Sequence, residues 1–223
     1  AGLVRFMGIT TLPPGYWFDE AHKSLVALQI VSSERFPIFV TDYQGVEAGF
    51  MWLLAGLFKL FGPSHFATRY LAALIGTATI PLTYWSVKQI YHANPHASSL
   101  GLLSASLLAF LFWHLLWSRL GLENITVSFF SISCLGGVAW AVRVPNFWRS
   151  VAVGVWLGLT QYVSPSARIL PLLVIGALVL LAPSWRTALT VGLSIFSLAA
   201  FIYAPLGWFY WQNPEWFFNR MSF

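Results

Sequence analysis

The chain has 223 residues, of which 58% are hydrophobic and only 9% are charged, and its mean hydropathy is +0.71. This small number of charges cannot cover the surface of a soluble protein of this length. The composition therefore predicts an integral membrane protein made of helices. The net charge is +5, but Lys and Arg stand singly between apolar runs, which excludes a basic stripe for nucleic acid.

The first element expected is part of a membrane span. Residues 1–12 are apolar but fall short of the roughly 20 residues that cross a bilayer, so we interpret them as the end of a span that begins before this sequence. We expect the chain to be the N-terminal part of a longer enzyme. Pro13-Pro14-Gly15 then ends the helix, because Pro cannot continue it and Gly permits a turn.

A polar loop is predicted over 13–48. Asp19 occupies the position expected for a helix N-cap, and a helix is predicted over 20–35. Leu25 and Leu28 share one of its faces, so this helix suits the membrane interface. The stretch 36–45 is expected to be an irregular loop.

The rest of the chain is predicted to be a single transmembrane domain, an all-α polytopic bundle. The apolar stretch 48–61 has about 14 residues, which suits an interfacial or re-entrant helix better than a span. Six spans are expected over 66–87, 98–117, 125–142, 147–163, 166–183 and 187–206. Residues 207–223 are expected to begin a second large loop.

Counting these spans alternately places every acidic residue on one side of the membrane. The acids are Asp19, Glu20, Glu34, Asp42, Glu47, Glu123 and Glu215. The opposite side receives the basic residues Lys88, Arg143, Arg149 and Arg186. This distribution favours an extracytoplasmic location for the acids, although Arg69, Arg119, Arg168 and Arg220 lie on the acidic side as well.

Asp19 and Glu20 place two adjacent carboxylates beside an aromatic run. Carboxylates at an interface can act as a general base, hold a metal or bind a cationic ligand. They can also simply cap the following helix and complement its dipole. Glu47 could bring another carboxylate over the same site or serve its own helix in that way, whereas Asp42 suits a turn.

Arg69, Arg119 and Arg168 each lie near the acidic-side end of a predicted span. Arginine in lipid is costly, so such residues pair with acids or face a polar cavity. Three that converge could hold a phosphate, which guanidinium binds in bidentate fashion. Each could instead snorkel to the interface, and Arg119 could pair with Glu123 four residues later.

Asp19, Glu20 and His22 could offer three ligands to a metal, but no matching set occurs elsewhere in the chain. We therefore assign no cofactor and no metal site, and a divalent metal stays an open alternative.

Several segments, spread in order over nearly the whole chain, resemble bacterial membrane glycosyltransferases related to the protein O-mannosyltransferases and the lipid A aminoarabinose transferases. They are Leu12–Ala21, Gly45–Ala48, Leu60–Ser64 with Arg69, Trp117–Gly121, Gly158–Tyr162 with Ser166–Arg168, and Asn213–Arg220. Ala48 and the Glu123-Asn124 pair depart from the commonest family pattern. The resemblance implies a C-type glycosyltransferase fold and transfer of a sugar from a polyprenyl phosphate outside the cytoplasmic membrane.

The resemblance also implies roles for individual residues. Asp19 would be the base for the acceptor hydroxyl, and Glu20 or Glu47 would orient the acceptor or tune Asp19. Arg69, Arg119 and Arg168 would hold the lipid phosphate. We expect Asp19 to face a cavity that also receives at least one of these arginines, without a tight salt bridge that would weaken it as a base.

The expected partners are the polyprenyl-phosphate sugar and membrane lipids, with no nucleic acid and with the acceptor left open. One rival interpretation is a non-catalytic membrane scaffold subunit that keeps the same fold. A transporter is a second rival, which the crowding of the acids into one loop disfavours.

Overall fold

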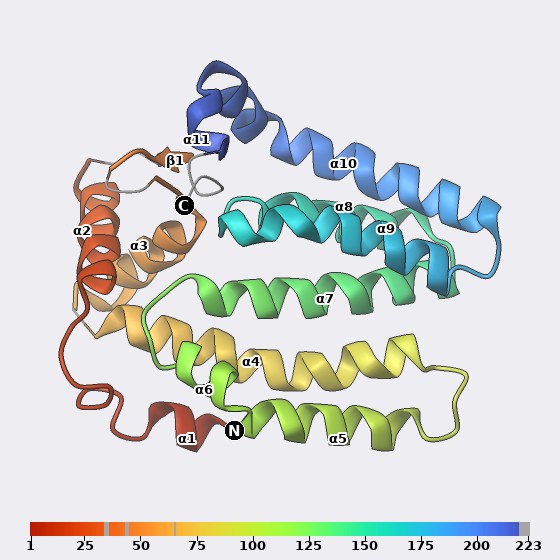
Figure 1. The fold of residues 1–223 in the computed structure, drawn as a ribbon, viewed down its shortest axis with the longest axis horizontal. Helices are drawn as coiled ribbons and strands as arrows, with labels where there is room; N and C mark the ends of the chain where they lie inside the picture. Colours follow the sequence, from red (N-terminus) through yellow and green to blue (C-terminus); the bar gives the residue numbers. More distant parts are fainter. Residues whose placement is uncertain (34–35, 43–44, 65, 219–223) are drawn as a thin grey trace.

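The computed structural model describes residues 1–33, 36–42, 45–64 and 66–218, and these ranges are mostly helical. Glu34 and Arg220, assigned above to the acidic side, lie outside the described residues. The longer helices run side by side, and the chain reverses direction from each to the next (Figure 1). They are α4 (Ala67–Ile90), α5 (Ala97–Phe110), α7 (Asn124–Arg143), α8 (Phe147–Thr160), α9 (Leu170–Leu181) and α10 (Trp185–Gln212).

Three of the described helices, α4, α7 and α10, are long and apolar enough to cross a membrane. The other predicted spans are shorter: α5 and α8 have 14 residues each, and α9 has 12 after the short 3₁₀ helix η1 (Pro165–Ile169). The prediction of one continuous span over 98–117 is wrong, because the extended backbone of Leu111 separates α5 from α6 (Phe112–Trp117). An all-α protein suited to a membrane is thus confirmed, with fewer full-length spans than expected.

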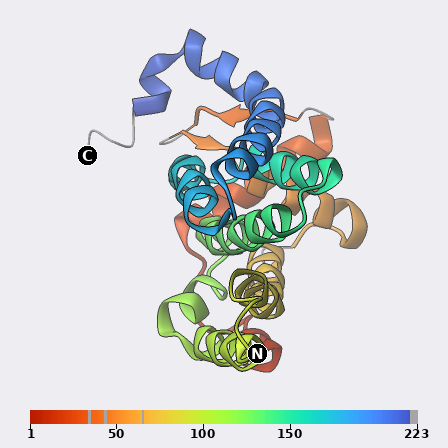
Figure 2. The same cartoon turned by 90° about the vertical axis from the view of Figure 1, so that its right-hand side faces the viewer.

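Viewed along the helices, α5 lies at one edge, followed by α4 and α7, with α8, α9 and α10 beyond (Figure 2). Small residues allow close approach between neighbours. A Cβ on Gly136 of α7 would lie 2.3 Å from Ser86 Oγ of α4, and one on Gly154 of α8 would lie 2.7 Å from the Ile195 carbonyl oxygen of α10. Such contacts bring helices together where lipid gives no hydrophobic driving force.

A cap of shorter elements lies at one end of the bundle, formed largely by the predicted 13–48 loop (Figure 1). Its members are α1 (Gly2–Phe6), α2 (Phe18–Ser33), β1 (Phe39–Val40), β2 (Val46–Glu47), α3 (Gly49–Phe61) and α11 (Pro214–Phe218). The stretch 36–45 is less irregular than expected, since β1 pairs antiparallel with β2. Helix α3 has 13 residues and extends about 20 Å, too short for a bilayer core of about 30 Å, as predicted.

Helix α2 packs onto the protein by a different face from the one predicted for the membrane interface. Leu25 and Leu28 are exposed, whereas Ile30 packs into the core shared with α3. Glu20 and Lys23 join the buried face, because each has a partner of opposite charge inside the protein. The face predicted for the membrane interface is thus left outside the protein core.

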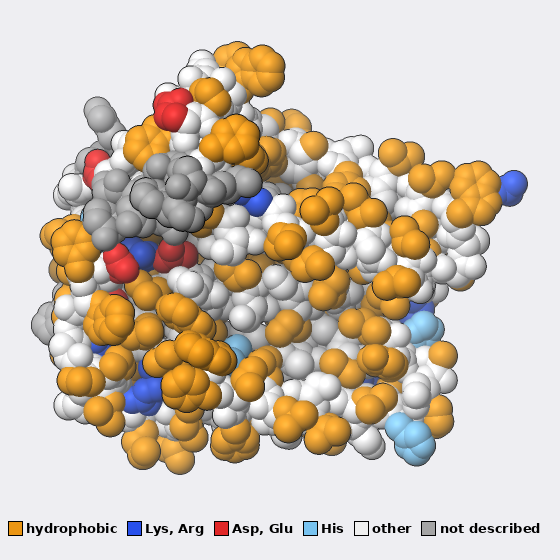
Figure 3. All heavy atoms as spheres, in the orientation of Figure 1, with side chains coloured by type: hydrophobic (Ala, Val, Ile, Leu, Met, Phe, Trp, Pro, Cys, Tyr) orange, Lys and Arg blue, Asp and Glu red, His pale blue; other side chains and the backbone are white. Residues whose placement is uncertain are grey.

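The described acidic residues all belong to the cap or to the turn beside it. Asp19 and Glu20 lie on α2, Glu47 on β2 and Glu215 on α11. On the visible face of Figure 3, acidic side chains gather at this end. The cations Lys88, Arg143, Arg149 and Arg186 lie at helix ends on the opposite side, in agreement with the predicted alternation.

Candidate functional site

Glu20 is the centre of a buried polar cluster. Its side chain is 0% exposed, and Arg69, 1% exposed, binds it through Nε to Oε1 and Nη2 to Oε2, both at 2.9 Å. The backbone N–H of Trp17 donates to Oε2 at 3.0 Å, and that of Gly121 donates to Oε1 at 2.8 Å. Glu20 thus ties the first turn of α2 to the start of α4 and to the turn before α7.

Arg69 uses all of its donors at this junction. A guanidinium has five N–H donors. Besides Glu20, they reach the carbonyl oxygens of Ile9, Pro13 and Gly15. No donor remains for a phosphate, so the geometry gives Arg69 the role of an anchor for the loop over 9–15.

The same contacts decide the protonation of Glu20. Burial by itself would raise the pKa of this carboxyl, but Arg69 and the N–H groups of Trp17 and Gly121 lower it more, and the pKa lies below its ordinary value. A carboxylate held ionised in this way is a weak proton acceptor, and its geometry suits a structural role.

A second polar site lies on the adjacent face of α2. Asp19, His22 and Lys23, at positions i, i+3 and i+4 of the helix, line a cavity of about 200 Å³. Lys23 Nζ lies 2.9 Å from Glu123 Oε2, and both side chains are less than one tenth exposed. The other lining residues are Asp42, Gly45, Val46, Trp117, Leu122 and Asn124.

Asp19 differs from the other two predicted catalytic carboxylates. It is half-buried, faces the cavity, and makes no ion pair or hydrogen bond within the described ranges. Helix α2 begins at Phe18, so Asp19 lies in its first turn instead of at the N-cap. Asp19 and Glu123 share one cavity, so they lie at the same end of the bundle, as predicted.

The prediction that an arginine shares this cavity is wrong. Arg69, Arg119 and Arg168 are absent from its lining, and the cation there is Lys23. Lys23 was not among the predicted site residues, although its position four residues after Asp19 on a helix places both on one face. Only its partner Glu123, distant in sequence, makes its burial possible.

Arg119 ties α1 to the end of α6. Its Nη1 donates to the Val4 carbonyl oxygen at 2.7 Å, and its Nη2 donates to that of Leu12 at 3.0 Å. The considered pairing with Glu123 does not form, since Glu123 binds Lys23 instead.

Glu47 and Arg168 form a third cluster with Tyr210. Glu47 is 0% exposed, and its Oε1 accepts from Arg168 Nη2 at 2.9 Å and from the Tyr210 hydroxyl at 2.8 Å. Arg168 Nη2 also donates to the Tyr210 oxygen at 2.9 Å. The cluster joins β2, η1 and α10, so Glu47 has no open side comparable to that of Asp19.

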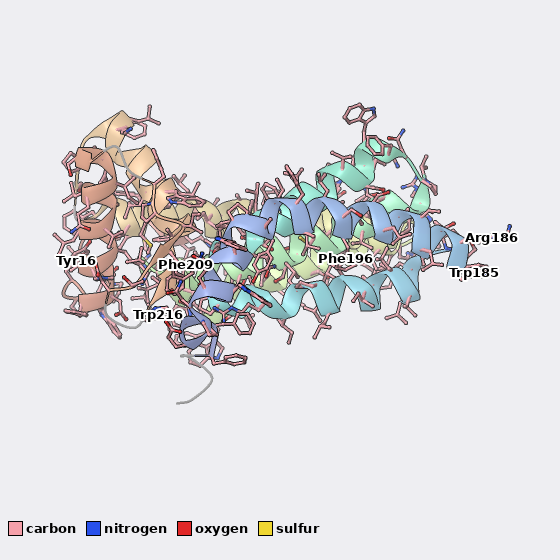
Figure 4. All side chains as sticks on the ribbon, turned by 90° about the horizontal axis from the view of Figure 1, so that it is seen from above. Tyr16, Trp185, Arg186, Phe196, Phe209 and Trp216 are labelled. Carbon is pink, nitrogen blue, oxygen red and sulfur yellow. The ribbon has the colours of Figure 1, made fainter. Side chains whose placement is uncertain are left out.

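Arg168 also stands at the head of an apolar groove of about 280 Å³. The remaining lining residues are Leu157, Gln161, Pro171, Phe196, Ala199, Ala200, Tyr203 and Phe217. Phe196 lies midway along α10, and Trp216, next to Phe217, lies at the cap (Figure 4). The groove therefore runs from a cationic head at the cap toward the middle of the bundle.

Helix α11 lines the groove and packs against one residue of the Asp19 cavity. Gly45, which lines the Asp19 cavity, has φ +70°, and a Cβ on it would lie 2.6 Å from the Trp216 ring. The next residue, Phe217, lines the groove and accepts a hydrogen bond from Arg168 through its carbonyl oxygen. Two neighbouring residues of one short helix thus lie beside residues of both spaces.

In the described ranges, no group of three or more His, Cys, Asp or Glu side chains is placed to hold a metal ion. Comparisons of the chain with known protein families, with curated proteins and with solved structures find no match.

Proposed function

We propose that this chain is the membrane part of a glycosyltransferase of the C-type fold, which moves a sugar from a polyprenyl phosphate to an acceptor hydroxyl. The observation that carries the proposal is the contrast between adjacent carboxylates. Glu20 is buried and saturated with donors, whereas Asp19 faces a polar cavity without a bound cation. A general base needs the second environment, because it must reach a substrate proton and accept it.

The chemistry places Asp19 beside the acceptor. Its carboxylate takes the hydroxyl proton while the acceptor oxygen bonds to the anomeric carbon, and the bond from that carbon to the phosphate oxygen breaks. The lipid phosphate leaves with the electron pair as an anion. Lys23 lines the same cavity and pairs with Glu123. It stabilises the charge of the leaving phosphate when it contacts that phosphate as well as Glu123.

The groove headed by Arg168 suits the donor lipid. Its walls are apolar, which matches a prenyl chain, and its cationic end lies at the cap, which matches a phosphate. For a donor to reach Asp19, its phosphate and sugar must extend past α11, which lines the groove and packs against Gly45 of the Asp19 cavity. Arg168 takes the lipid-phosphate role in this scheme, and Arg69 and Arg119 take structural ones.

The proposal fixes the orientation in the membrane. A polyprenyl-linked donor is confined to the bilayer, so the enzyme is a multi-pass protein of the cytoplasmic membrane with the cap facing outside. The acid-rich cap then meets the acceptor, and the basic opposite end faces the cytoplasm.

A scaffold subunit with this fold is the second candidate. One observation favours it: Glu20, Arg69, Arg119 and Glu47 are all engaged in contacts within the protein. In that case the Asp19 cavity would have no catalytic use.

The test is Asp19→Asn in the full-length protein, incubated with a panel of polyprenyl-phosphate hexoses and pentoses. Transfer should fall by the roughly 10²–10⁴-fold expected for loss of a general base, with folded protein retained. Glu215→Gln is the matched control, an exposed carboxylate of the same cap outside the cavity, and should keep transfer. Near-normal turnover in Asp19→Asn would remove Asp19 from the mechanism, and absence of transfer in the unaltered protein across the panel would favour the scaffold.

A further inference from the structure

The end of the bundle opposite the cap carries cations without acids. Lys88 lies at the end of α4, Arg143 at the end of α7, and Arg149 and Arg186 in the first turns of α8 and α10. The sequence has no Asp or Glu between Glu47 and Glu123 or between Glu123 and Glu215. No acid of these segments can therefore neutralise the four cations, which carry most of the net charge of +5.

Exposed aromatic rings lie at the same helix ends as these cations. Trp148 is 73% exposed and Trp185 is 69% exposed, with Phe147 and Tyr91 also open to the outside. Trp185 and Arg186 project together from the far end of α10 (Figure 4). Aromatic rings beside cations are typical of the level where lipid headgroups meet the hydrocarbon core.

Contacts with aromatic residues orient two of these cations without neutralising their charge. The Arg149 guanidinium lies 4.6 Å from the centre of the Trp140 ring and donates to the Trp140 carbonyl oxygen at 3.1 Å. Lys88 Nζ lies 5.2 Å from the centre of the Tyr84 ring. Contacts of this kind orient a cation and leave its full charge for an external anion.

A small cavity opens beside one of these cations, Arg143. It has a volume of about 140 Å³ and is lined by Arg143, His92 and Gln89 together with apolar residues of α7 and the α9–α10 turn. Gln89 Oε1 is buried with no hydrogen-bond partner in the described part of the chain. The cavity thus combines a cation, polar side chains and an apolar wall, which match the head and the chain of a phospholipid.

We propose that the acid-free end of the bundle is a binding surface for anionic membrane phospholipids, whose phosphate groups are held by Lys88, Arg143, Arg149 and Arg186. The occupant is a lipid because exposed rings and an apolar wall accompany the charges at a helix-bundle end. This surface does not depend on the sugar-transfer chemistry of the cap.

The experiment measures which lipids stay on the intact protein. Protein purified with a mixture of phosphatidylglycerol and phosphatidylcholine is analysed by native mass spectrometry. We expect phosphatidylglycerol to be enriched on the protein, and the enrichment to fall as salt is raised. Arg186→Gln should weaken the binding of phosphatidylglycerol about fivefold, because one cation near an anionic surface contributes about that factor to binding. The triple variant Arg143→Gln/Arg149→Gln/Arg186→Gln should weaken it about 100-fold.

Lys59→Gln is the matched control, because Lys59 is an exposed cation at the cap end. Thermal unfolding in lipid-free detergent checks that each variant is folded. If the triple variant is unfolded, the comparison rests on Arg186→Gln alone. Equal retention of both lipids by the unaltered protein would overturn the proposal, as would an equal loss in Lys59→Gln and Arg186→Gln. Displacement of phosphatidylglycerol by inorganic phosphate would also overturn it, because the site would then select a small anion instead of a lipid.

Discussion

Two adjacent carboxylates on α2 have opposite surroundings, and this contrast decides what each can do. Glu20 points into the protein and meets a bidentate arginine and two backbone donors. Asp19 is turned about 100° around the helix and meets the cavity instead. Proximity in sequence therefore does not make them a catalytic pair.

Breaking the Glu20–Arg69 pair should destabilise the protein. Glu20→Gln leaves Arg69 buried without its counter-charge, and removal of one partner of a buried pair costs about 3–5 kcal/mol. The free energy of unfolding in detergent measures this loss. Asp19→Asn, with no ion pair to lose, should cost well under 1 kcal/mol, and equal losses in the two variants would contradict the structural role of Glu20.

The same pair predicts a dependence of stability on pH. Because the pKa of Glu20 is lower in the folded state than its ordinary value of 4.5, ionised Glu20 stabilises the fold fully well above pH 4.5. That stabilisation is lost as the pH falls below 4.5 and through the folded-state pKa. Unfolding temperatures between pH 7 and pH 3 should fall more for the unaltered protein than for Glu20→Gln, and parallel curves would argue against this assignment.

At the scale of elements, Gly45, between β1 and β2, packs against Trp216 of α11. Gly45 has a positive φ, where other residues are strained, and leaves room for the Trp216 ring. Gly45→Ala should displace α11 and cost more than the roughly 1 kcal/mol of the conformation alone. Proteolysis or hydrogen exchange of 214–218 measures the displacement. Gly15→Ala is the control, because Gly15 also has a positive φ, +81°, but a Cβ there meets open space, so this variant introduces backbone strain without a steric contact. Unchanged protection of α11 in Gly45→Ala would show that this contact does not hold it.

Hydropathy and helix breakers located most elements but not the polar contacts between them. The boundaries of α4 and α7 follow their apolar runs to within a few residues, because length and composition define such helices. No Pro or Gly at Leu111 indicates the break between α5 and α6 in the sequence. The buried side of α2 was also missed, because it depends on Glu123 and Arg69, which come from distant parts of the chain.

For the molecule as a whole, charge is divided between its two ends. All described acids belong to the cap or the turn beside it, and the opposite end has cations and exposed aromatic rings (Figure 3). A bundle that crosses a membrane is expected to keep its basic end at the cytoplasmic surface. The proposed orientation and the proposed lipid preference therefore both rest on one distribution of residues.

The transmembrane arrangement predicts that the two ends are reached from opposite sides of the membrane. Cys134 is the sole cysteine and is buried, so the unaltered protein should resist a membrane-impermeant maleimide and serves as the control. Thr41→Cys at the cap and His96→Cys between α4 and α5 each add one exposed thiol. In intact cells, Thr41→Cys should react and His96→Cys should not, and permeabilised cells should label both. Labelling of both in intact cells would mean that α4 does not cross the membrane. Labelling of His96→Cys alone would place the Asp19 cavity on the cytoplasmic side, where a donor presented outside could not reach it.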